Sequence, residues 1–386
     1  MVGQIDAPLP LVQEPTPPLK RAMNTDFDII VIGAGMAGAS VAAHLAETRK
    51  VLVLEMEERP GYHSTGRSAA MFEPNYGPAP IRALTRAARR AFDALGVLTP
   101  RETIFFMTEG QDKDFDTLMQ AQAGMHEISI SEAHEKYPLL RTSHVRRAIL
   151  DPGTAEIDVD LLHQHFLKTL KSHGGEIACN NKVESISRGN GIWRVDAAGI
   201  SFRAPIIVNA AGAWGDVVAA MAGANPVGLQ PKRRSMAVMP MPDGHDASAW
   251  PMITDAGETW YSKAQSGKLL VSPADATPVD PHDAFADDMA LAEGIDRFQQ
   301  AVTFEITRVE HSWGGLRSFV ADGNPVVGFD GKLEGFFWLV GQGGYGIQTA
   351  PALSRTAAAL VHGEPVPADV LAEGLEIADL SPLRFS

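Results

Sequence analysis

Cysteine is nearly absent from this chain of 386 residues, in which Cys179 stands alone. A single cysteine excludes an internal disulfide and provides no cluster of ligands for zinc or for an iron–sulfur centre. We therefore expect a protein without a metal site, folded in a reducing compartment. Cys179 itself is expected to be a buried strand residue.

Basic residues are also fewer than acidic residues in this chain. The 33 Lys and Arg residues face 47 Asp and Glu residues, which gives a formal net charge of −14. Nucleic acids and anionic membrane surfaces repel such a chain, so we expect neither as a partner, although local basic pockets are compatible with this charge.

Long apolar runs are missing. No stretch approaches the roughly 20 apolar residues that cross a bilayer, and prolines occupy residues 1–25, where a signal peptide would have an apolar helix. We therefore expect a cytoplasmic protein with a disordered N-terminal extension at 1–25. Met23 is a second candidate for the first residue of the native chain.

The first folded segment has what a dinucleotide site requires. A short β-branched run at 27–32 is followed by Gly33, Gly35 and Gly38 in the G-x-G-x-x-G spacing, and then by a helical pattern at 39–48. Gly33 permits a tight turn, Gly35 lets the backbone approach a pyrophosphate, and Gly38 lets the helix pack closely on the strands. Unpaired amides at the helix N-terminus would stabilise the phosphate charge.

Glu55 completes this unit. It follows a second predicted strand at 50–54 and lies about 20 residues after the first glycine, where a carboxylate accepts hydrogen bonds from both ribose hydroxyls. A carboxylate at this point disfavours a 2′-phosphate. A glycine turn alone would be a weak signal, but the strand, helix, second strand and acid together predict a nucleotide site rather than an empty Rossmann-like unit.

The remaining chain predicts further elements and no internal repeat. From 230 to about 307, short alternating strands with Pro and Gly turns indicate an antiparallel sheet. Other expected elements are helices at 81–95, 131–137 and 158–172, a strand at 103–107, a strand pair at 176–186 and one apolar strand at 201–211.

The length of 386 residues exceeds one typical domain. We expect an α/β chain of mixed α+β character, in which a Rossmann-like nucleotide-binding domain is interleaved with an antiparallel-sheet substrate domain. The first domain is assigned residues 26–100, 151–225 and 309–386, and the second 101–150 and 226–308.

A second glycine turn lies late in the chain. An apolar strand at 335–340 leads into Gly343, Gly344 and Gly346, which open a long helical pattern. A flavin needs two helix ends, one for the pyrophosphate and one for the N1 and O2 edge of the ring, where negative charge accumulates on reduction. A nicotinamide cofactor needs only the first, so this turn favours a flavin over a plain helix cap.

Five stretches of the chain carry a resemblance to a known family. They are PGYHSTGRSAA at 60–70, VNAAGAW at 208–214, LQPKRRS at 229–235, GLRSFVADG at 315–323 and GYGIQT at 344–349. On these stretches the chain resembles the D-amino acid oxidase superfamily of FAD-dependent oxidoreductases, and within it the bacterial D-arginine dehydrogenases. The resemblance covers nearly the whole chain after residue 25.

The resemblance implies FAD as the cofactor. Some flavoenzymes of this superfamily attach FAD through a cysteine, but Cys179 lies in the GGEIACNN strand, so non-covalent FAD is expected. The small and hydroxylated residues of 64–71 suit a segment that wraps the pyrophosphate and the ring. The residues assigned to FAD binding are Gly33, Gly35, Ala37, Gly38, Glu55, Met56, Ser64, Thr65, Arg67, Ser68, Ala69, Ala70, Met71, Val183, Gly212, Gly343, Gly344, Tyr345, Gly346 and Ile347.

By the same resemblance, Arg234 and Arg317 bind the substrate carboxylate, and the hydroxyls of Tyr76 and Tyr261 complete this clamp. A planar guanidinium suits the task because it binds both carboxylate oxygens and stays charged. Neighbouring residues on a strand point to opposite faces, so only one of Arg233 and Arg234 can enter the site. The resemblance indicates Arg234.

A structural role is the alternative for each member of the clamp. Arg317 would otherwise form an ion pair with Asp322 or Glu310, and the two tyrosines would otherwise be packing residues. The three basic residues from Lys232 to Arg234 also suit a solvated turn.

The clamp implies the reaction. Two arginines would orient the substrate so that its Cα–H faces flavin N5, and a hydride would leave the deprotonated amine without a base at carbon. The imino acid would hydrolyse to a 2-oxo acid and ammonia. We expect a dehydrogenase for a D-amino acid that passes electrons to a quinone or another carrier, a preference over oxygen that rests on resemblance alone.

Departures from the dehydrogenase pattern leave the substrate side chain open. Thr103 stands where those enzymes have an acidic residue, although a shift of one residue would bring Glu102 to this position. Met71 replaces the flavin-loop histidine of those enzymes, and Glu73 replaces a nearby threonine. A neutral and a cationic substrate side chain are equally compatible with these changes.

Three other functions share these features. The first is oxidation of a secondary amine, such as an opine or a cyclic imino acid, by one subunit of a larger flavoprotein complex. The second is oxidation of a 2-hydroxy acid, for which a histidine base near N5 would be expected and no clear one is found. The third is a flavin-binding regulatory or assembly protein without turnover.

Overall fold

The computed structural model describes residues 25–121, 124–242 and 245–385. The predicted N-terminal extension lies outside these ranges except for Thr25. Within these ranges, four β-sheets and the helices packed on them confirm the predicted mixed α/β class. Within the described ranges no helix is long and apolar enough to cross a membrane.

A six-stranded sheet contains the predicted dinucleotide unit. Its order is β20 (Val326–Phe329), β21 (Phe336–Val340), β13 (Ile206–Asn209), β1 (Ile29–Ile32), β2 (Val51–Leu54) and β9 (Glu176–Ala178). All neighbours run parallel except β20 and β21. Strands β1, β2 and β21 are buried throughout, which explains their continuous apolar sequences.

The two faces of this sheet pack against different layers. Ile29 and Val31 contribute to a core with four helices, whereas Ile30 and Ile32 face a three-stranded sheet and α6 (Gly215–Ala222). The helices are α1 (Met36–Leu45), α2 (Ala79–Leu95), α5 (Val159–Ser172) and α8 (Gly346–His362). The three strands are β10 (Val183–Gly189), β11 (Ile192–Ala197) and β12 (Ile200–Ala204).

A nine-stranded sheet forms the second large layer. Its path is β18 (Thr277–Pro278), β14 (Gln230–Pro240), β17 (Lys268–Ser272), β16 (Tyr261–Gln265), β15 (Met252–Asp255), β5 (Thr103–Met107), β7 (Arg147–Asp151) and β6 (His126–Ile128), with β19 (His311–Phe319) paired to β14. The sheet is antiparallel except between β15 and β5. Its helices are α3 (Asp112–Ala121), α4 (Ile130–Lys136) and α7 (Asp288–Ala301).

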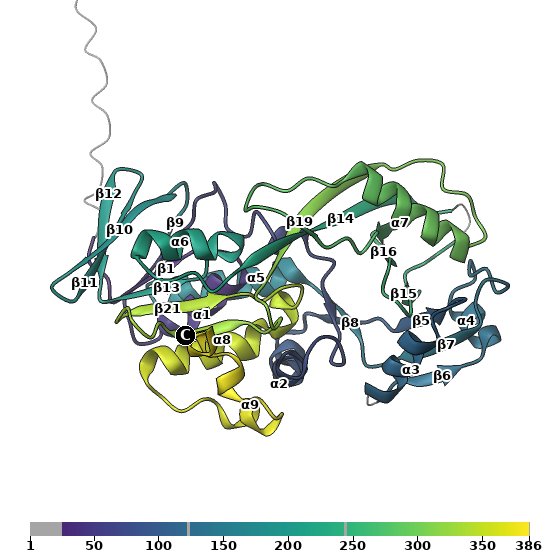
Figure 1. The fold of residues 1–386 in the computed structure, drawn as a ribbon, viewed down its shortest axis with the longest axis horizontal. Coiled ribbons are helices and arrows are strands. Elements are labelled where there is room, and N and C mark those ends of the chain that lie inside the picture. Colours follow the sequence, from purple (N-terminus) through teal and green to yellow (C-terminus); the bar gives the residue numbers. More distant parts are fainter. Residues whose placement is uncertain (1–24, 122–123, 243–244, 386) are drawn as a thin grey trace, which may run out of the picture.

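Short elements join these layers. The second three-stranded sheet in the described ranges is β3 (Met71–Phe72), β8 (Ala155–Ile157) and β4 (Leu98–Pro100). The remaining helices there are α9 (Ala368–Ala372), η1 (Thr65–Arg67), η2 (Gly212–Trp214), η3 (Ile377–Asp379) and η4 (Pro382–Phe385). Figure 1 shows β10 to β12 at one end of an elongated molecule and β5 to β7 at the other, with β14 and β19 between them.

Several predicted elements need correction. The strand pair at 176–186 is wrong, because β9 joins the six-stranded sheet and β10 joins the three-stranded one, with Asn180 in a left-handed conformation between them. The single strand at 201–211 is two strands, β12 and β13, which Pro205 separates. Helix α1 begins earlier than predicted, and α7 interrupts the stretch that was expected to hold strands only.

We propose the two interleaved domains expected from the sequence, with one boundary moved. Strand β19 pairs with β14 from Gln230 opposite Phe319 to Val238 opposite His311. A boundary at 309 would separate these paired strands, so we assign β19 to the substrate domain.

Candidate active site

A long cavity begins at the carboxyl ends of β1 and β2, passes the N-terminus of α1 and reaches β19 and the N-terminus of α8. Gly33 has a φ of +101°, and a Cβ atom there would lie 2.5 Å from the Ala210 carbonyl oxygen. A Cβ atom on Gly38 would collide with the Gly33 carbonyl oxygen. Neither position admits a side chain. The turn from β1 into α1 therefore presents backbone atoms, rather than side chains, at the cavity wall.

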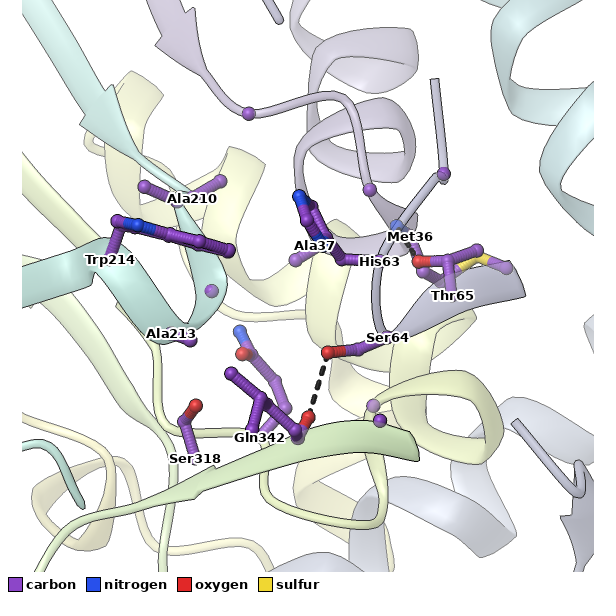
Figure 2. A pocket seen from close by; sticks show the side chains of 18 of the residues that line it. Met36, Ala37, His63, Ser64, Thr65, Ala210, Ala213, Trp214, Ser318 and Gln342 are labelled. Atoms are coloured by element: carbon purple, nitrogen blue, oxygen red, sulfur yellow. Dashed lines mark hydrogen bonds between the residues drawn. The ribbon is translucent and has the colours of Figure 1, made fainter. Parts of the chain in front are cut away.

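Glu55 lies on this wall at the end of β2 and is 7% exposed. Its Oε2 accepts a hydrogen bond from the Ala34 amide at 2.8 Å, and its Oε1 accepts one from the Glu57 amide at 3.0 Å. These bonds fix the carboxylate beside the glycine turn. Ala37, in the first turn of α1, lines the same wall (Figure 2).

The segment from Ser64 to Ala69 forms part of the wall of this cavity. The Ser64 hydroxyl donates to the Leu316 carbonyl at 2.7 Å (Figure 2), and Thr65 Oγ1 accepts a hydrogen bond from the Met36 amide at 2.9 Å. The segment is therefore tied both to the start of α1 and to β19.

Arg67 holds this segment to the substrate domain. Its guanidinium lies 2.5 Å from Asp283 Oδ1 and donates to the carbonyls of Ala284 at 2.9 Å and Gly314 at 3.1 Å. Tyr62 donates to the other oxygen of Asp283 at 3.3 Å. Although Arg67 lines the cavity, protein groups already engage its guanidinium.

Three aromatic residues on the cavity wall, Tyr62, His63 and Trp214, were not assigned to it from the sequence. The rings of His63 and Trp214 lie 4.7 Å apart between centroids (Figure 2), and His63 Nε2 lies 2.8 Å from Glu57 Oε1. The stretch VNAAGAW, which carried part of the resemblance, already contained Trp214 as a signal. The stretch PGYHSTGRSAA, which also carried the resemblance, likewise contained Tyr62 and His63.

A smaller cavity adjoins the long one and contains the predicted clamp. Tyr76, Arg234, Tyr261 and Arg317 all line it, from the turn after β3 and from β14, β16 and β19. The residues that line both cavities are Ser68, Ala69, Arg234, Tyr261, Arg317, Gly344 and Ile347. Four residues from distant parts of the sequence thus meet in the smaller cavity.

Arg233 and Arg234 have opposite surroundings. Arg233 pairs with Asp275 at 3.5 Å and with Asp287 at 2.9 Å. Arg234 enters both cavities, where its Nε donates to the Asp275 carbonyl at 2.7 Å and its guanidinium stands 5.9 Å from the Tyr261 ring centroid. The strand alternation expected from the sequence therefore separates the two arginines.

The structural alternative for Arg317 is not realised. Asp322 pairs with Arg384 at 2.7 Å, and Glu310 pairs with Lys268 at 2.7 Å. Across the described ranges, no carboxylate oxygen lies within 4.0 Å of a side-chain nitrogen of either Arg317 or Arg234. Two cations without an ion-pair partner therefore share one cavity.

Burial and charge explain how these groups titrate. Burial, followed by the positive charge of Arg317, lowers the pKa of Arg234. Burial raises the pKa of Tyr76, which keeps its hydroxyl protonated as a donor. Burial opposes ionisation of Tyr261 as well, but the charges of Arg317 and Arg234 outweigh it and lower the pKa of that hydroxyl. This electrostatic environment suits a small carboxylate.

Acidic residues line another side of the smaller cavity. Burial, followed by the negative charges of Glu258 and Asp151, raises the pKa of Glu73 to about 8. Glu102 and Thr103, which the sequence suggested as positions facing the substrate side chain, line neither cavity. Glu102 pairs with Lys136 at 2.7 Å, and Thr103 is fully buried beside Thr154.

The other residues assigned to FAD binding fall into three groups. Ala70 and Met71 line only the smaller cavity. Gly38 and Tyr345 line neither cavity: Gly38 packs against the turn, and Tyr345 packs edge to face against Tyr76. All remaining assigned residues line the long cavity, namely Gly33, Gly35, Ala37, Glu55, Met56, Ser64, Thr65, Arg67, Ser68, Ala69, Val183, Gly212, Gly343, Gly344, Gly346 and Ile347.

Cys179 lies between β9 and β10 and lines neither cavity. It is partly exposed rather than buried, and burial of the thiol still raises its pKa. The thiol is thus placed away from the cavities that a bound cofactor would occupy.

Comparisons with known proteins agree with this arrangement. Residues 28–360 match the family described as FAD dependent oxidoreductase. Glycine oxidase of Bacillus licheniformis is 24% identical over 362 residues, which cover 89% of this chain and 95% of that protein. Mitochondrial sarcosine dehydrogenase of Homo sapiens is 24% identical over 390 residues, which cover 92% of this chain but only 41% of that protein.

The crystal structure of glycine oxidase from Geobacillus kaustophilus has the same fold. It superposes with a TM-score of 0.79 over 93% of this chain and 98% of that one, at 21% sequence identity.

Proposed function

The chain belongs to the family of FAD-dependent oxidoreductases, and from this premise we propose that it oxidises a D-amino acid to the imino acid, which water converts to a 2-oxo acid and ammonia. The observation that carries the proposal is the pair of guanidiniums, Arg234 and Arg317, which lack an ion-pair partner within the described ranges and stand where the two cavities meet. Two fixed cations at this point suit the carboxylate of an amino acid.

The long cavity fits FAD on its own geometry. The bare backbone at Gly33 and Gly35 and the N-terminus of α1 suit a pyrophosphate, and the Glu55 carboxylate suits a ribose. The N-terminus of α8, opened by Gly343 and Gly344, suits the pyrimidine edge of the ring. When bound, FAD would supply a hydride acceptor at N5.

The chain's own contribution is to orient the substrate. Arg234 and Arg317 would hold the carboxylate, and the hydroxyls of Tyr76 and Tyr261 would donate to it or close over it. With the carboxylate fixed, the Cα–H bond is directed toward the long cavity. The nitrogen lone pair forms the C=N bond as the hydride leaves, so no side chain has to remove a proton from carbon.

The D configuration and the electron acceptor are finer parts of the proposal. The stretches that resemble D-arginine dehydrogenases support a D-amino acid, and the absence of Cys179 from both cavities supports non-covalent FAD. We propose a quinone or another carrier as the acceptor. Anaerobically reduced protein should return electrons to a soluble quinone faster than to oxygen.

Anaerobic mixing with a substrate panel tests the function. The purified FAD-loaded protein is mixed with D-amino acids, L-amino acids and 2-hydroxy acids, and bleaching of the visible flavin band is followed. Bleaching by D-amino acids alone is the expected result. Bleaching by L-amino acids alone, or by 2-hydroxy acids alone, would overturn it.

A second candidate is oxidation of a secondary amine. The match to a sarcosine dehydrogenase over 92% of this chain favours it, although this chain spans only 41% of that protein. Sarcosine, dimethylglycine and opines therefore belong in the same panel. Faster bleaching by one of these than by every D-amino acid would favour this alternative.

A further inference from the structure

Gln348, in the first turn of α8, carries a polar group that the described structure leaves unpaired. The residue is 3% exposed and lines the smaller cavity. Its Oε1 accepts a hydrogen bond from the Glu73 amide at 3.0 Å, which fixes the orientation of the side-chain amide. Its Nε2 is buried and has no hydrogen-bond partner among the described residues. Buried donors are rarely left unpaired in native proteins, so this one, on a cavity wall, is available to a ligand.

The Glu73 carboxyl group stands beside it in the same cavity. No hydrogen bond to this carboxyl is found within the part of the chain that the structure describes. Burial and nearby negative charge raise the pKa of Glu73 to about 8, so at neutral pH it is mainly a neutral acid. Its carbonyl oxygen remains available as an acceptor.

The position of this pair relative to the clamp decides which part of a substrate it would meet. Arg234, Arg317 and Gly344 line both cavities, whereas Glu73 and Gln348 line only the smaller one. Phe105, Met252 and Thr254 also line only the smaller cavity. A substrate held by its carboxylate at the junction would therefore extend its side chain toward this polar pair.

We propose that Glu73 and Gln348 together bind the side-chain carboxamide of a D-amino acid of the D-asparagine or D-glutamine type. The inference rests on the function proposed above and adds the substrate class. A carboxamide is the group that pairs with both residues, because its NH2 donates to Glu73 and its carbonyl accepts from Gln348 Nε2.

Other side chains match less well. A cationic side chain pairs only with Glu73, leaves Nε2 unpaired and must first ionise an acid that is neutral at pH 7. An aliphatic side chain leaves both groups unpaired. Sites built to hydrogen-bond a substrate discriminate strongly against analogues that lack the polar group.

The experiment compares flavin reduction by D-glutamine, D-asparagine, D-leucine, D-lysine and D-alanine. We expect the rate constant of reduction divided by the dissociation constant to be roughly ten-fold or more higher for the better carboxamide than for D-leucine or D-lysine. Gln348→Glu keeps the oxygen that accepts from the Glu73 amide and removes the donor, whereas Glu73→Leu removes the side-chain acceptor. Each variant should lower the ratio of D-glutamine to D-alanine efficiency roughly ten-fold, chiefly through the dissociation constant. Glu102→Gln, outside the cavity, is the matched control and should leave this ratio unchanged.

Three results would overturn the inference. One is a preference of the wild-type protein for D-lysine or D-leucine, which would leave the proposed function intact. Another is an equal loss with all D-amino acids in Gln348→Glu, together with a shifted visible spectrum of the substrate-free protein, which would assign Nε2 to the flavin. The last is a flavin that no D-amino acid bleaches, in which case the proposed function fails first.

Discussion

Gly344 lies so close to Arg317 that a Cβ atom added to the glycine would stand 2.9 Å from Nη1 of the guanidinium. Gly344 belongs to the turn that opens α8, and Arg317 belongs to β19 in the other large sheet. The late glycine turn therefore leaves the space in which the Arg317 guanidinium sits.

Gly344→Ala should displace the Arg317 guanidinium and weaken the clamp without emptying the long cavity. We expect the efficiency of flavin reduction to fall roughly 10- to 100-fold, since a misplacement of about 1 Å at a reacting centre has effects of this size. The measurement is anaerobic reduction at several substrate concentrations, with bound FAD quantified in parallel.

Gly189→Ala is the control for adding a methyl group, because a Cβ atom at Gly189 meets nothing within 4 Å. It should behave as wild type. An unchanged reduction rate in Gly344→Ala would show that Arg317 does not hold the substrate where we place it.

Replacement of the clamp arginines should affect substrate far more than cofactor. Arg317→Lys and Arg234→Lys each keep a positive charge but lose the planar fork, and we expect a loss of about 2 kcal/mol, or roughly 30-fold, in substrate affinity. Arg233→Lys is the neighbouring control, since Arg233 pairs with Asp275 and Asp287 rather than entering the cavity. Titration with D-alanine and determination of FAD content would separate the two effects. Equal losses in all three variants would remove the distinction between Arg233 and Arg234.

The contrast between Arg233 and Arg234 also shows which parts of the site can be predicted from the sequence. Strand alternation separates Arg233 from Arg234 without a structure, because it depends only on the period of two. The glycine turn after β1 can also be predicted from the sequence, because its spacing is a local pattern. The four residues of the clamp were chosen by resemblance, and the structure brings them to one cavity.

Other features were beyond sequence reasoning because they depend on tertiary contacts. Gln348 has the sequence context of an ordinary helix residue, and only the fold places it beside Glu73. The segment at 176–186 reads as one strand pair, yet its two strands join different sheets. Local patterns specify strands but not their partners.

We expect the ion pair between Arg67 and Asp283 to slow the dissociation of FAD. This ion pair joins the segment from Ser64 to Ala69 to the substrate domain. Arg67→Ala and Asp283→Ala should each accelerate FAD release roughly five-fold, because a partly exposed ion pair contributes about 1 kcal/mol. The rate of FAD release is measured by flavin fluorescence after the protein is diluted under conditions that prevent FAD from rebinding.

A double-mutant cycle provides the control for this contact. If the two residues act together, the double variant releases FAD about as fast as either single variant. Arg59→Ala removes a nearby cation that stacks on Tyr62 and should leave the rate unchanged. Additive effects of Arg67→Ala and Asp283→Ala would contradict the coupling.

The pH dependence of stability should reveal the protonated state of Glu73. Its pKa in the folded protein is raised to about 8, because of burial first and the charges of Glu258 and Asp151 next. The folded state therefore holds a proton that the unfolded state releases above a pH of about 4.5. The stabilising contribution is fully present below that pH and is lost as the pH rises to about 8, at about 1.4 kcal/mol for each pH unit. Denaturant unfolding of wild type and Glu73→Gln at pH 5, 6, 7 and 8 measures the difference. The wild-type protein should lose stability relative to the variant across this window, whereas parallel curves would show that the folded protein already carries an ionised Glu73.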